Sequence, residues 1–451
     1  MRKTTQEGWV KLPSSAAPAA PCSALAPAQR TRFAATVRFR PARPSAVYVR
    51  TRRRQPNETG APVQPVYNEA HRNRFSACVP AAKDGELMTD ASSSPLDPNN
   101  AGDVDASGGI GTDSANAQRI LFGPRRFVRQ GHVQTLLARR RPPDSVTLRT
   151  EQAMLLDAGP DESGFDPDHP VTLLGYYNPA LRPTRQRGLV QIMHGWHGSS
   201  HSSDVLYISD MLLKAGYSVF RLNMRDHGPN LHFARGALNR GMFLGTLLNE
   251  VAVATRTVAA LAGDRPFALV GGSLGGNFVL RLGDAHNREP IPNLRRIVAI
   301  CPAVRPDAAA WAIDNITAYR LYFRARWMQS LRAKQSLFPE TYNFAAVERL
   351  RAIVPMTEAL VRDYSQWQNA QEYFDHYSVS PQMVAGLRVP TTIIAARDDA
   401  VIPIADIEAF APSANVDIQI TETGGHMGFV DVFPYRRWLP GAILEELERA
   451  L

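Results

Sequence analysis

A serine flanked by glycines is the strongest chemical signal in this sequence. Gly271-Gly272-Ser273-Leu274-Gly275 follows the apolar segment 267–270, a predicted strand, and opens a predicted helix over 275–285. A serine in this context lies on a tight turn that exposes its hydroxyl, and the N-terminus of the following helix favours developing negative charge. The pattern therefore predicts Ser273 as a nucleophile. A dinucleotide-binding loop is the competing interpretation, but that loop requires glycine where this chain has Ser273.

A nucleophilic serine needs a base that is oriented by an acid. The predicted strand 390–396 runs into Arg397-Asp398-Asp399, and the predicted strand 416–421 is followed by Gly424-Gly425-His426. In sheets with this kind of serine turn, the acid and then the histidine follow the serine along the chain. We therefore predict His426 as the base. The spacing from Asp399 to Pro403 favours Asp399 as the acid, and Asp398, the alternative, would then be a turn or helix-capping residue.

Acyl transfer also needs hydrogen-bond donors for the oxyanion. The predicted strand 189–193 ends in His194-Gly195-Trp196-His197-Gly198, and we expect the backbone N–H groups of Trp196 and Leu274 to be these donors. His194, His197 and His201 raise the possibility of zinc, but they lack the H-E-x-x-H spacing and no paired cysteines accompany them. Neither a metal nor a cofactor is expected. Arg225-Asp226-His227-Gly228 is expected to shape the rim of the site.

Predicted strands and helices alternate through most of the chain after residue 122. The predicted strands cover 145–156, 170–177, 189–193, 217–224, 267–270, 295–300, 390–396 and 416–421. The predicted helices cover 203–215, 242–261, 275–285, 404–410 and 439–450. This alternation indicates an α/β fold with a mostly parallel sheet that helices cover on both faces.

The alternation is interrupted over residues 305–388, which are helical and rich in aromatic residues. An inserted helical block of this kind is typical of a cap that covers a substrate. Its aromatic side chains have two interpretations: they line an apolar substrate pocket, or they pack the core of the cap. The aromatic residues are Trp311, Tyr319, Tyr322, Phe323, Trp327, Tyr342 and Trp367.

The charge of the protein is unevenly distributed. The 451 residues include 51 Lys+Arg and 42 Asp+Glu, a formal charge of +9, yet residues 1–80 alone carry 14 basic and 3 acidic side chains. The remaining chain has a net charge of −2, so no nucleic-acid partner is expected.

Residues 1–118 are predicted to be a disordered extension and 119–451 the folded domain. The arginines of 50–54 are either solvated or make a weak contact with an anionic surface or RNA.

The cysteines and the apolar runs bear on the compartment. Cys22, Cys78 and Cys301 are too few for a disulfide framework, which favours a reducing compartment. No apolar run approaches the length of a membrane span, and no apolar region of a secretory signal follows Arg2 and Lys3. A cytoplasmic location is expected. The sequence leaves the oligomeric state open.

Five segments resemble the α/β-hydrolases, and more narrowly the YheT-like family of predicted hydrolases and carboxylesterases, which includes eukaryotic lipid-handling members. The resemblance covers residues 122–451. The family's entry motif is matched by Gly131-His132-Val133-Gln134-Thr135, and its oxyanion loop by His194-Gly195 with Gly198-Ser199-Ser200. Its nucleophile turn is matched by Gly272-Ser273-Leu274-Gly275-Gly276-Asn277. Its acid loop is matched by Ala396-Arg397-Asp398-Asp399, and its histidine loop by Gly424-Gly425-His426-Met427-Gly428-Phe429. Two features depart from the family pattern: the Arg225-Asp226-His227-Gly228 segment, and the bulky Trp196 and His197 beside the oxyanion loop.

The resemblance implies an α/β-hydrolase fold and a catalytic triad of Ser273, Asp399 and His426. We expect a serine esterase that cleaves a small-molecule carboxylic ester through an acyl-enzyme, with an apolar or lipid ester as a candidate substrate. An acyltransferase or a thioesterase would use the same three residues. A protein of a different class, which binds a ligand in a hydrolase-like pocket without catalysis, remains a further alternative.

Overall fold

The computed structural model describes residues 10–11, 47–49, 122–165, 169–229 and 239–449 of the chain. The chain divides into two units, residues 1–51 with 121–451, and residues 52–120. All of the second unit lies outside the described residues. Within residues 1–118 only the short strands β1 (Val10–Lys11) and β2 (Val47–Val49) are described, so the prediction for this extension remains a prediction.

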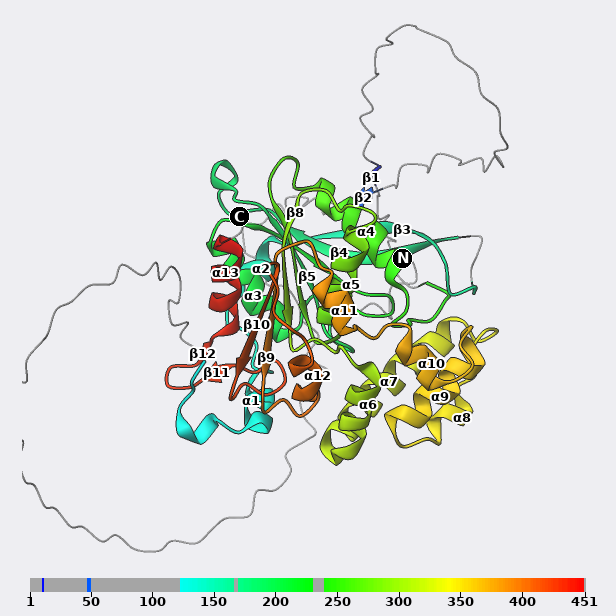
Figure 1. The fold of residues 1–451 in the computed structure, drawn as a ribbon. Helices are drawn as coiled ribbons and strands as arrows, with labels where there is room; N and C mark the ends of the chain where they lie inside the picture. Colours follow the sequence, from blue (N-terminus) through cyan, green and yellow to red (C-terminus); the bar gives the residue numbers. More distant parts are fainter. Residues whose placement is uncertain (1–9, 12–46, 50–121, 166–168, 230–238, 450–451) are drawn as a thin grey trace, which may run out of the picture. The chain divides into compact units, whose positions relative to one another are not determined.

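A single large sheet organises the first unit, in the strand order β1-β2-β3-β4-β6-β5-β7-β8-β9-β10. Strands β5 to β10 pair in parallel, whereas β1 to β4 form the antiparallel edge, with β4 antiparallel to β6. The strands from β3 onward are β3 (Gln152–Pro160), β4 (Pro170–Asn178), β5 (Leu189–Met193), β6 (Ser218–Leu222), β7 (Phe267–Gly272), β8 (Leu294–Ile300), β9 (Thr391–Ala396) and β10 (Val416–Thr421). The mostly parallel α/β sheet that the sequence predicts is confirmed (Figure 1).

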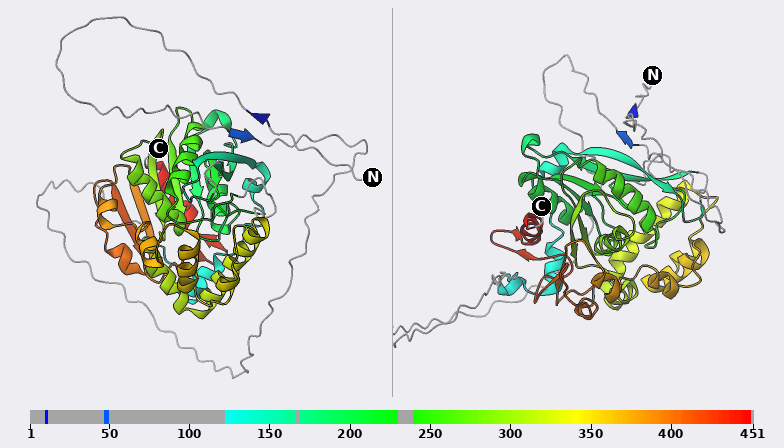
Figure 2. Two further views of the ribbon diagram at one scale, coloured as in Figure 1. Left: turned by 90° about the vertical axis from the view of Figure 1, so that its right-hand side faces the viewer. Right: turned by 45° about the horizontal axis from the view of Figure 1, so that its top comes forward.

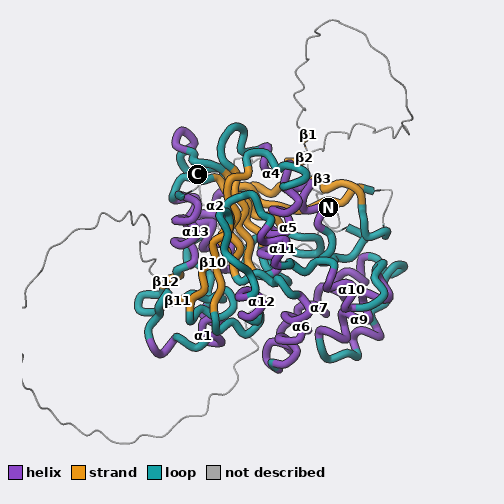
Figure 3. Tube along the Cα trace, in the orientation of Figure 1, coloured by secondary structure: helices purple, strands orange, loops and turns teal. Residues whose placement is uncertain are grey.

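Helices cover both faces of this sheet, as Figure 3 shows. Helices α3 (Ser203–Lys214) and α13 (Leu439–Glu448) pack on one face, and α4 (Leu248–Ala260) and α5 (Leu274–His286) on the other. Successive side chains of a strand point to opposite faces, so Val190 and Ile192 of β5 pack toward α3 while Leu189 and Met193 pack toward α4 and α5. This two-sided burial explains why the central strands are apolar runs instead of alternating patterns.

Two of the predicted elements differ from the structure. Residues Val146–Thr150 form helix α2 and not the start of a strand, because Thr147 is held by its backbone N–H and its hydroxyl to the Asp210 carboxylate of α3. The helix expected from residue 242 begins only at Leu248. Tertiary hydrogen bonds hold the backbone just before this helix: the Gly245 carbonyl accepts from the Arg281 guanidinium, and the Gly245 N–H donates to the Tyr373 hydroxyl.

Helices alone lie between β8 and β9, as expected for residues 305–388. They are α6 (Pro306–Asn315), α7 (Thr317–Leu337), α8 (Ala345–Glu348), α9 (Ile353–Tyr364), α10 (Ala370–Asp375) and α11 (Pro381–Ala385). Both views of Figure 2 show α6 to α10, coloured yellow-green to orange, gathered beyond one end of the sheet. This end carries the carboxyl ends of the parallel strands, where open α/β folds bind their ligands.

Four smaller elements lie at the same end of the molecule. The 3-10 helix η1 (Arg126–Val128) and helix α1 (Gly131–Leu137) precede β3 in the chain. A two-stranded hairpin of β11 (Val430–Asp431) and β12 (Arg436–Arg437) follows β10. Helix α12 (Ile404–Glu408) follows β9. Among the described residues, no helix combines the length and the apolar character needed to cross a bilayer.

Candidate active site

Ser273 lies on a sharp turn between β7 and α5. Its backbone has φ 54° and ψ −119°, a conformation that residues other than glycine rarely adopt. The turn is tight because its neighbours lack side chains: a Cβ at Gly275 would lie 2.3 Å from the Met193 carbonyl oxygen, and one at Gly271 would lie 2.2 Å from the Gly275 carbonyl oxygen. The glycines of the motif therefore permit the close passage that exposes the Ser273 hydroxyl.

The structure brings Ser273, His426 and Asp399 together in one chain of hydrogen bonds. His426 Nε2 lies 3.0 Å from Ser273 Oγ, and His426 Nδ1 lies 2.9 Å from Asp399 Oδ2. Asp399 Oδ1 accepts the backbone N–H groups of Val401 and Ile402 at 2.8 and 3.0 Å. The Asp399 side chain is almost fully buried and that of His426 is mostly buried. With Nδ1–H donating to the carboxylate, Nε2 is the ring nitrogen that can accept the serine proton.

Asp398 does not contact the His426 ring. Its Oδ1 accepts the backbone N–H of Gly425 at 2.8 Å, so this carboxyl holds the loop that carries the histidine. Burial raises the pKa of Asp398, which its hydrogen bonds with the Gly425 and Gly424 amides oppose. Of the two adjacent aspartates, Asp399 is the one positioned to orient the imidazole.

Two residues of the Gly131–Thr135 motif, Gln134 and Thr135, hold the loop that carries His426 by hydrogen bonds. Thr135 Oγ1 accepts the backbone N–H of His426 at 2.9 Å. The buried Gln134 side chain donates to the carbonyl of Val430 at 2.8 Å and accepts its N–H at 2.7 Å. The sequence analysis recognised this motif but assigned no role to Gln134 or Thr135. Their partners lie almost 300 residues away, so only the folded chain identifies them.

The two backbone amides predicted for the oxyanion belong to segments next to the nucleophile candidate, Ser273. Leu274 is the first residue of α5, so its N–H has no partner within the helix. Trp196 lies in the loop after β5, whose Gly195 packs so closely that a Cβ there would lie 3.1 Å from the Ser273 Cβ. Both loops therefore border the position that a carbonyl oxygen would occupy after attack by Ser273.

His194 holds the Trp196 loop instead of acting as a base or a metal ligand. It is fully buried, and its Nε2 accepts the Met224 N–H at 3.3 Å while Nδ1 lies 2.8 Å from the Gly195 carbonyl. Burial, together with the neighbouring His227, lowers the pKa of His194 to about 3. The imidazole is therefore neutral near pH 7, as this hydrogen-bond pattern requires.

The side chain of Trp196 packs on helix α7. Its ring lies parallel to Phe323, with centroids 5.6 Å apart and an interplanar angle of 10°, and edge-on to Trp327 at 5.0 Å. The next residue, His197, accepts a hydrogen bond from Arg326 Nη2 through its carbonyl at 3.2 Å. The loop that carries one candidate oxyanion donor is thus fastened to the helical insertion.

The Arg225-Asp226-His227-Gly228 segment fastens the insertion to the sheet. The buried Arg225 guanidinium donates to Glu250 at 3.0 Å and to Asp161 at 2.9 Å, which compensates both buried carboxylates. Asp226 accepts from the ammonium group of Lys334 in α7 at 2.8 Å. Lys334 is itself buried and also donates to two backbone carbonyls. None of these hydrogen bonds is to Ser273, and the expected role of the segment in shaping the rim of the site stays a prediction.

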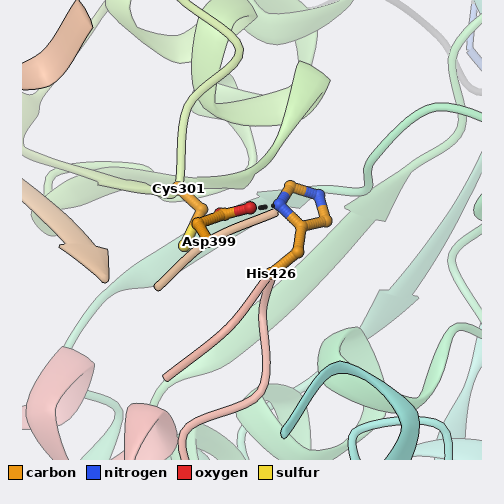
Figure 4. Close-up of side chains that lie close together, drawn as sticks. All are labelled: Cys301, Asp399 and His426. Carbon is orange, nitrogen blue, oxygen red and sulfur yellow. Dashed lines mark hydrogen bonds and ion pairs between the residues drawn. The ribbon is translucent and has the colours of Figure 1, made fainter. Parts of the chain in front are cut away.

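A third side chain, that of Cys301, lies close to Asp399 and His426. Cys301 follows β8, and its sulfur, a carboxylate oxygen of Asp399 and a ring nitrogen of His426 lie within 4.8 Å of one another (Figure 4). Burial raises the pKa of the Cys301 thiol well above its usual value, and the Asp399 carboxylate adds to this effect. Among the described residues this is the one cluster with metal-ligand character. His194, His197 and His201 do not form such a cluster; His201 is instead paired with Glu151 at 3.0 Å.

A cavity of about 780 Å³ connects Ser273 with the helical insertion. Its walls combine the loops that carry Ser273 and His426 with mostly apolar side chains of α6, α7, α9 and α10. Four of the seven aromatic residues noted in the insertion line it, namely Tyr319, Tyr322, Phe323 and Trp327. Tyr342 is instead buried away from it. Part of this aromatic set therefore lines a cavity and Tyr342 packs in the core, while binding of a substrate in the cavity stays a prediction.

The family assignment follows from a family model that matches more than half of the chain. The model, described as Hydrolase_4 (serine aminopeptidase, S33), matches residues 184–432. The chain belongs to this family. The matched region contains Ser273, Asp399 and His426 together with the helical insertion.

This hydrolase also resembles two known proteins. It is 22% identical over 334 residues to the phospholipase ABHD3 of Homo sapiens, covering 71% of this chain and 77% of the relative. It is 27% identical over 273 residues to the protein named "Putative esterase YheT" of Escherichia coli (strain K12), covering 58% of this chain and 75% of the relative. Among solved structures, an esterase Pf2001 structure of Pyrococcus furiosus aligns with a TM-score of 0.40 at 16% identity, over 63% of this chain and 89% of that one. The resemblance to YheT-like α/β-hydrolases is confirmed.

Proposed function

We propose that this hydrolase cleaves small-molecule carboxylic esters through an acyl-enzyme. The observation that carries the proposal is the pair of hydrogen bonds that joins Ser273 Oγ to His426 Nε2 and His426 Nδ1 to Asp399 Oδ2, at 3.0 and 2.9 Å. The spacing matches that of a nucleophile, a general base and an orienting acid.

In the proposed first half-reaction, Ser273 Oγ attacks the ester carbonyl carbon while His426 Nε2 takes its proton. Asp399 stabilises the imidazolium that forms. The backbone N–H groups of Trp196 and Leu274 donate to the oxyanion of the tetrahedral intermediate. Collapse of the intermediate breaks the bond to the alkoxy group, which leaves as the alcohol after it receives the proton from His426. The acyl group remains on Ser273 as an ester.

In the second half-reaction, His426 takes a proton from water and the oxygen of that water attacks the acyl carbon. The intermediate collapses to the carboxylic acid, and Ser273 recovers its proton from His426. The proposed sequence of steps uses side chains and backbone N–H groups of this chain, together with water. The apolar wall formed by Phe323, Trp327 and other side chains of residues 305–388 favours an acyl chain or another apolar group as the part of the substrate that is bound there. We infer that these residues act as a substrate-binding cap.

Labelling with a fluorophosphonate probe tests the nucleophile directly. We expect the full-length protein to be labelled, and the Ser273→Ala variant to lose the label completely. The Ser336→Ala variant, which replaces an exposed serine of α7, should be labelled like the wild type.

p-Nitrophenyl esters of increasing chain length should be hydrolysed with falling KM. Product analysis with an added alcohol then distinguishes hydrolysis from acyl transfer. If the wild type is not labelled and hydrolyses none of these esters, the result would favour a ligand-binding protein without catalysis.

The contact between Trp196 and α7 predicts that residues of the insertion affect the chemical step. Phe323→Ala removes the ring that lies parallel to Trp196, and we expect kcat for p-nitrophenyl acetate to fall by about tenfold, a fraction of the roughly 10²–10³-fold cost of losing a donor. The acetyl group is too short to need the ring for binding, so KM should change little. Leu321→Ala, an exposed position on the same helix, serves as the control and should leave kcat unchanged. An effect of Phe323→Ala on KM alone would contradict this prediction.

A further inference from the structure

Large apolar side chains are exposed on η1, on α1 and on the β11–β12 hairpin. Phe433 in the β11–β12 hairpin is 74% exposed, Phe127 in η1 65%, and Leu136 in α1 60%. The rings of Phe127 and Phe433 lie against each other, with centroids 6.3 Å apart, so they form one apolar projection from two distant parts of the chain. Exposed apolar side chains that gather in this way usually mark a binding surface.

Direct contacts join these elements into one surface, which we call the rim face and define by Phe127, Leu136, Tyr322, Phe433 and Arg139 to Arg141. The Arg139 guanidinium lies 4.3 Å above the ring of Tyr322 in α7. That of Arg140 lies 4.8 Å above the ring of Tyr435 in the hairpin, whose hydroxyl donates to the Leu137 carbonyl at 2.9 Å. In Figure 1, α1 and the hairpin lie near each other at the end of the sheet where α6 and α7 also lie.

The charge of the rim face has a single sign. Residues 122–141 contain six arginines and no acidic residue, and Arg326 of α7, which lines the cavity, is also exposed. The hairpin contributes one carboxylate, Asp431, which is paired with Arg125 at 3.7 Å. Arg139, Arg140 and Arg141 are all exposed. Residues 81–451 as a whole carry a net charge of −2, so the six arginines of residues 122–141 are a local concentration of positive charge.

The rim face also borders the entrance to the candidate active site. Leu136, Arg139, Arg141 and Tyr322 line the cavity that ends at Ser273, although all four are exposed. The cavity therefore opens to solvent between α1 and α7. A molecule held on the rim face would lie at this opening.

We propose that the rim face binds the surface of an anionic lipid bilayer. Arginines interleaved with exposed aromatic and aliphatic side chains match the two layers of such a surface, the negative head groups and the apolar chains beneath them. A second copy of this chain would bring like charge to the same face. The segment 84–118 is acidic, with seven carboxylates and no basic residue, but it contains no aromatic residue and would not match the exposed rings. The proposal concerns binding, so it holds or fails independently of the proposed hydrolysis.

Vesicle co-sedimentation tests this proposal with the full-length chain carrying Ser273→Ala, so that turnover cannot alter the lipid. We expect binding to vesicles of equal parts phosphatidylcholine and phosphatidylglycerol, and none to phosphatidylcholine alone. The triple variant Arg139→Gln, Arg140→Gln, Arg141→Gln should bind about 100-fold more weakly, at about fivefold for each basic side chain removed. The double variant Phe127→Ser, Phe433→Ser should also bind at least tenfold more weakly.

The N-terminal arginines provide the matched control, because they could bind anionic lipid by charge alone. The variant Arg52→Gln, Arg53→Gln, Arg54→Gln should retain more affinity than the rim-face triple variant. The reverse order would overturn the proposal, and so would unchanged binding by the Phe127, Phe433 variant or no binding to either vesicle. Binding to soluble polyglutamate as tight as that to the vesicles would identify an acidic polypeptide as the partner and would also overturn it. Matching thermal unfolding curves exclude misfolding as the cause of any loss.

Discussion

Replacement of Ser273 by alanine is expected to lower kcat for a p-nitrophenyl ester by about 10⁶-fold, the size of effect that loss of a nucleophilic serine has in other hydrolases. The hydroxyl oxygen is the atom that would form the acyl-enzyme, and no other group in the site can replace it: Cys301 is buried with a raised pKa. Residual turnover would come from water held near the oxyanion donors. The measurement is steady-state hydrolysis followed by release of p-nitrophenol.

The same variant should keep its fold, because Ser273 Oγ has His426 as its partner and fills little volume. Thermal unfolding of Ser273→Ala and of the Ser336→Ala control should therefore agree with the wild type. A loss of kcat smaller than tenfold in a folded Ser273→Ala protein would show that another group performs the attack. The triad mechanism would then have to be abandoned.

Replacement of Asp399 by asparagine is expected to lower kcat by about 10⁴-fold while the geometry is retained. Asp399 Oδ1 accepts two backbone N–H groups, from Val401 and Ile402, so the asparagine oxygen must take this position. The amide NH₂ then points at His426 Nδ1, which has to accept. The proton moves to Nε2, and the imidazole can no longer take the proton of Ser273.

Asp398→Asn is the matched control, because the two aspartates are adjacent and lie on the same loop. Its amide oxygen can still accept the Gly425 N–H, so we expect less than a tenfold change in kcat. Both variants are compared by kcat at a pH where the wild type is fully active. A larger loss for Asp398→Asn than for Asp399→Asn would reverse the assignment of the acid.

Much of the sheet could be predicted because its strands are short apolar runs between turn residues. Leu189–Met193, Thr391–Ala396 and Val416–Thr421 match the predicted segments to within a residue. Local patterns fail where a distant partner competes with them. The carboxylate of Asp210 holds Val146–Thr150 as a helix, and hydrogen bonds to Gly245 delay the start of α4.

The candidate site also has parts that local sequence patterns predict and parts that depend on distant contacts. The order of serine, acid and histidine behind successive strands is a property of the chain, and the end of each parallel strand lies at the same edge of the sheet. The choice between Asp398 and Asp399 needed the positions of their oxygens, because both residues follow the same strand. The hydrogen bond from the His426 amide to Thr135 crosses 291 residues, and no spacing in the sequence indicates such a pair.

The sequence by itself determined the fold class, the edge of the sheet that carries the chemistry and the residue types at that edge. The fold class, the sheet edge and the residue types follow from apolar periodicity, from the glycines of a tight turn around Ser273, and from the order of the motifs. The tertiary structure decided which carboxylate reaches the imidazole, how Trp196 is fastened to α7, and where exposed aromatic rings and arginines form one surface. Each of these depends on contacts between segments far apart in the chain. Contacts of that kind arise when the sheet and its helices pack, and local sequence patterns do not record them.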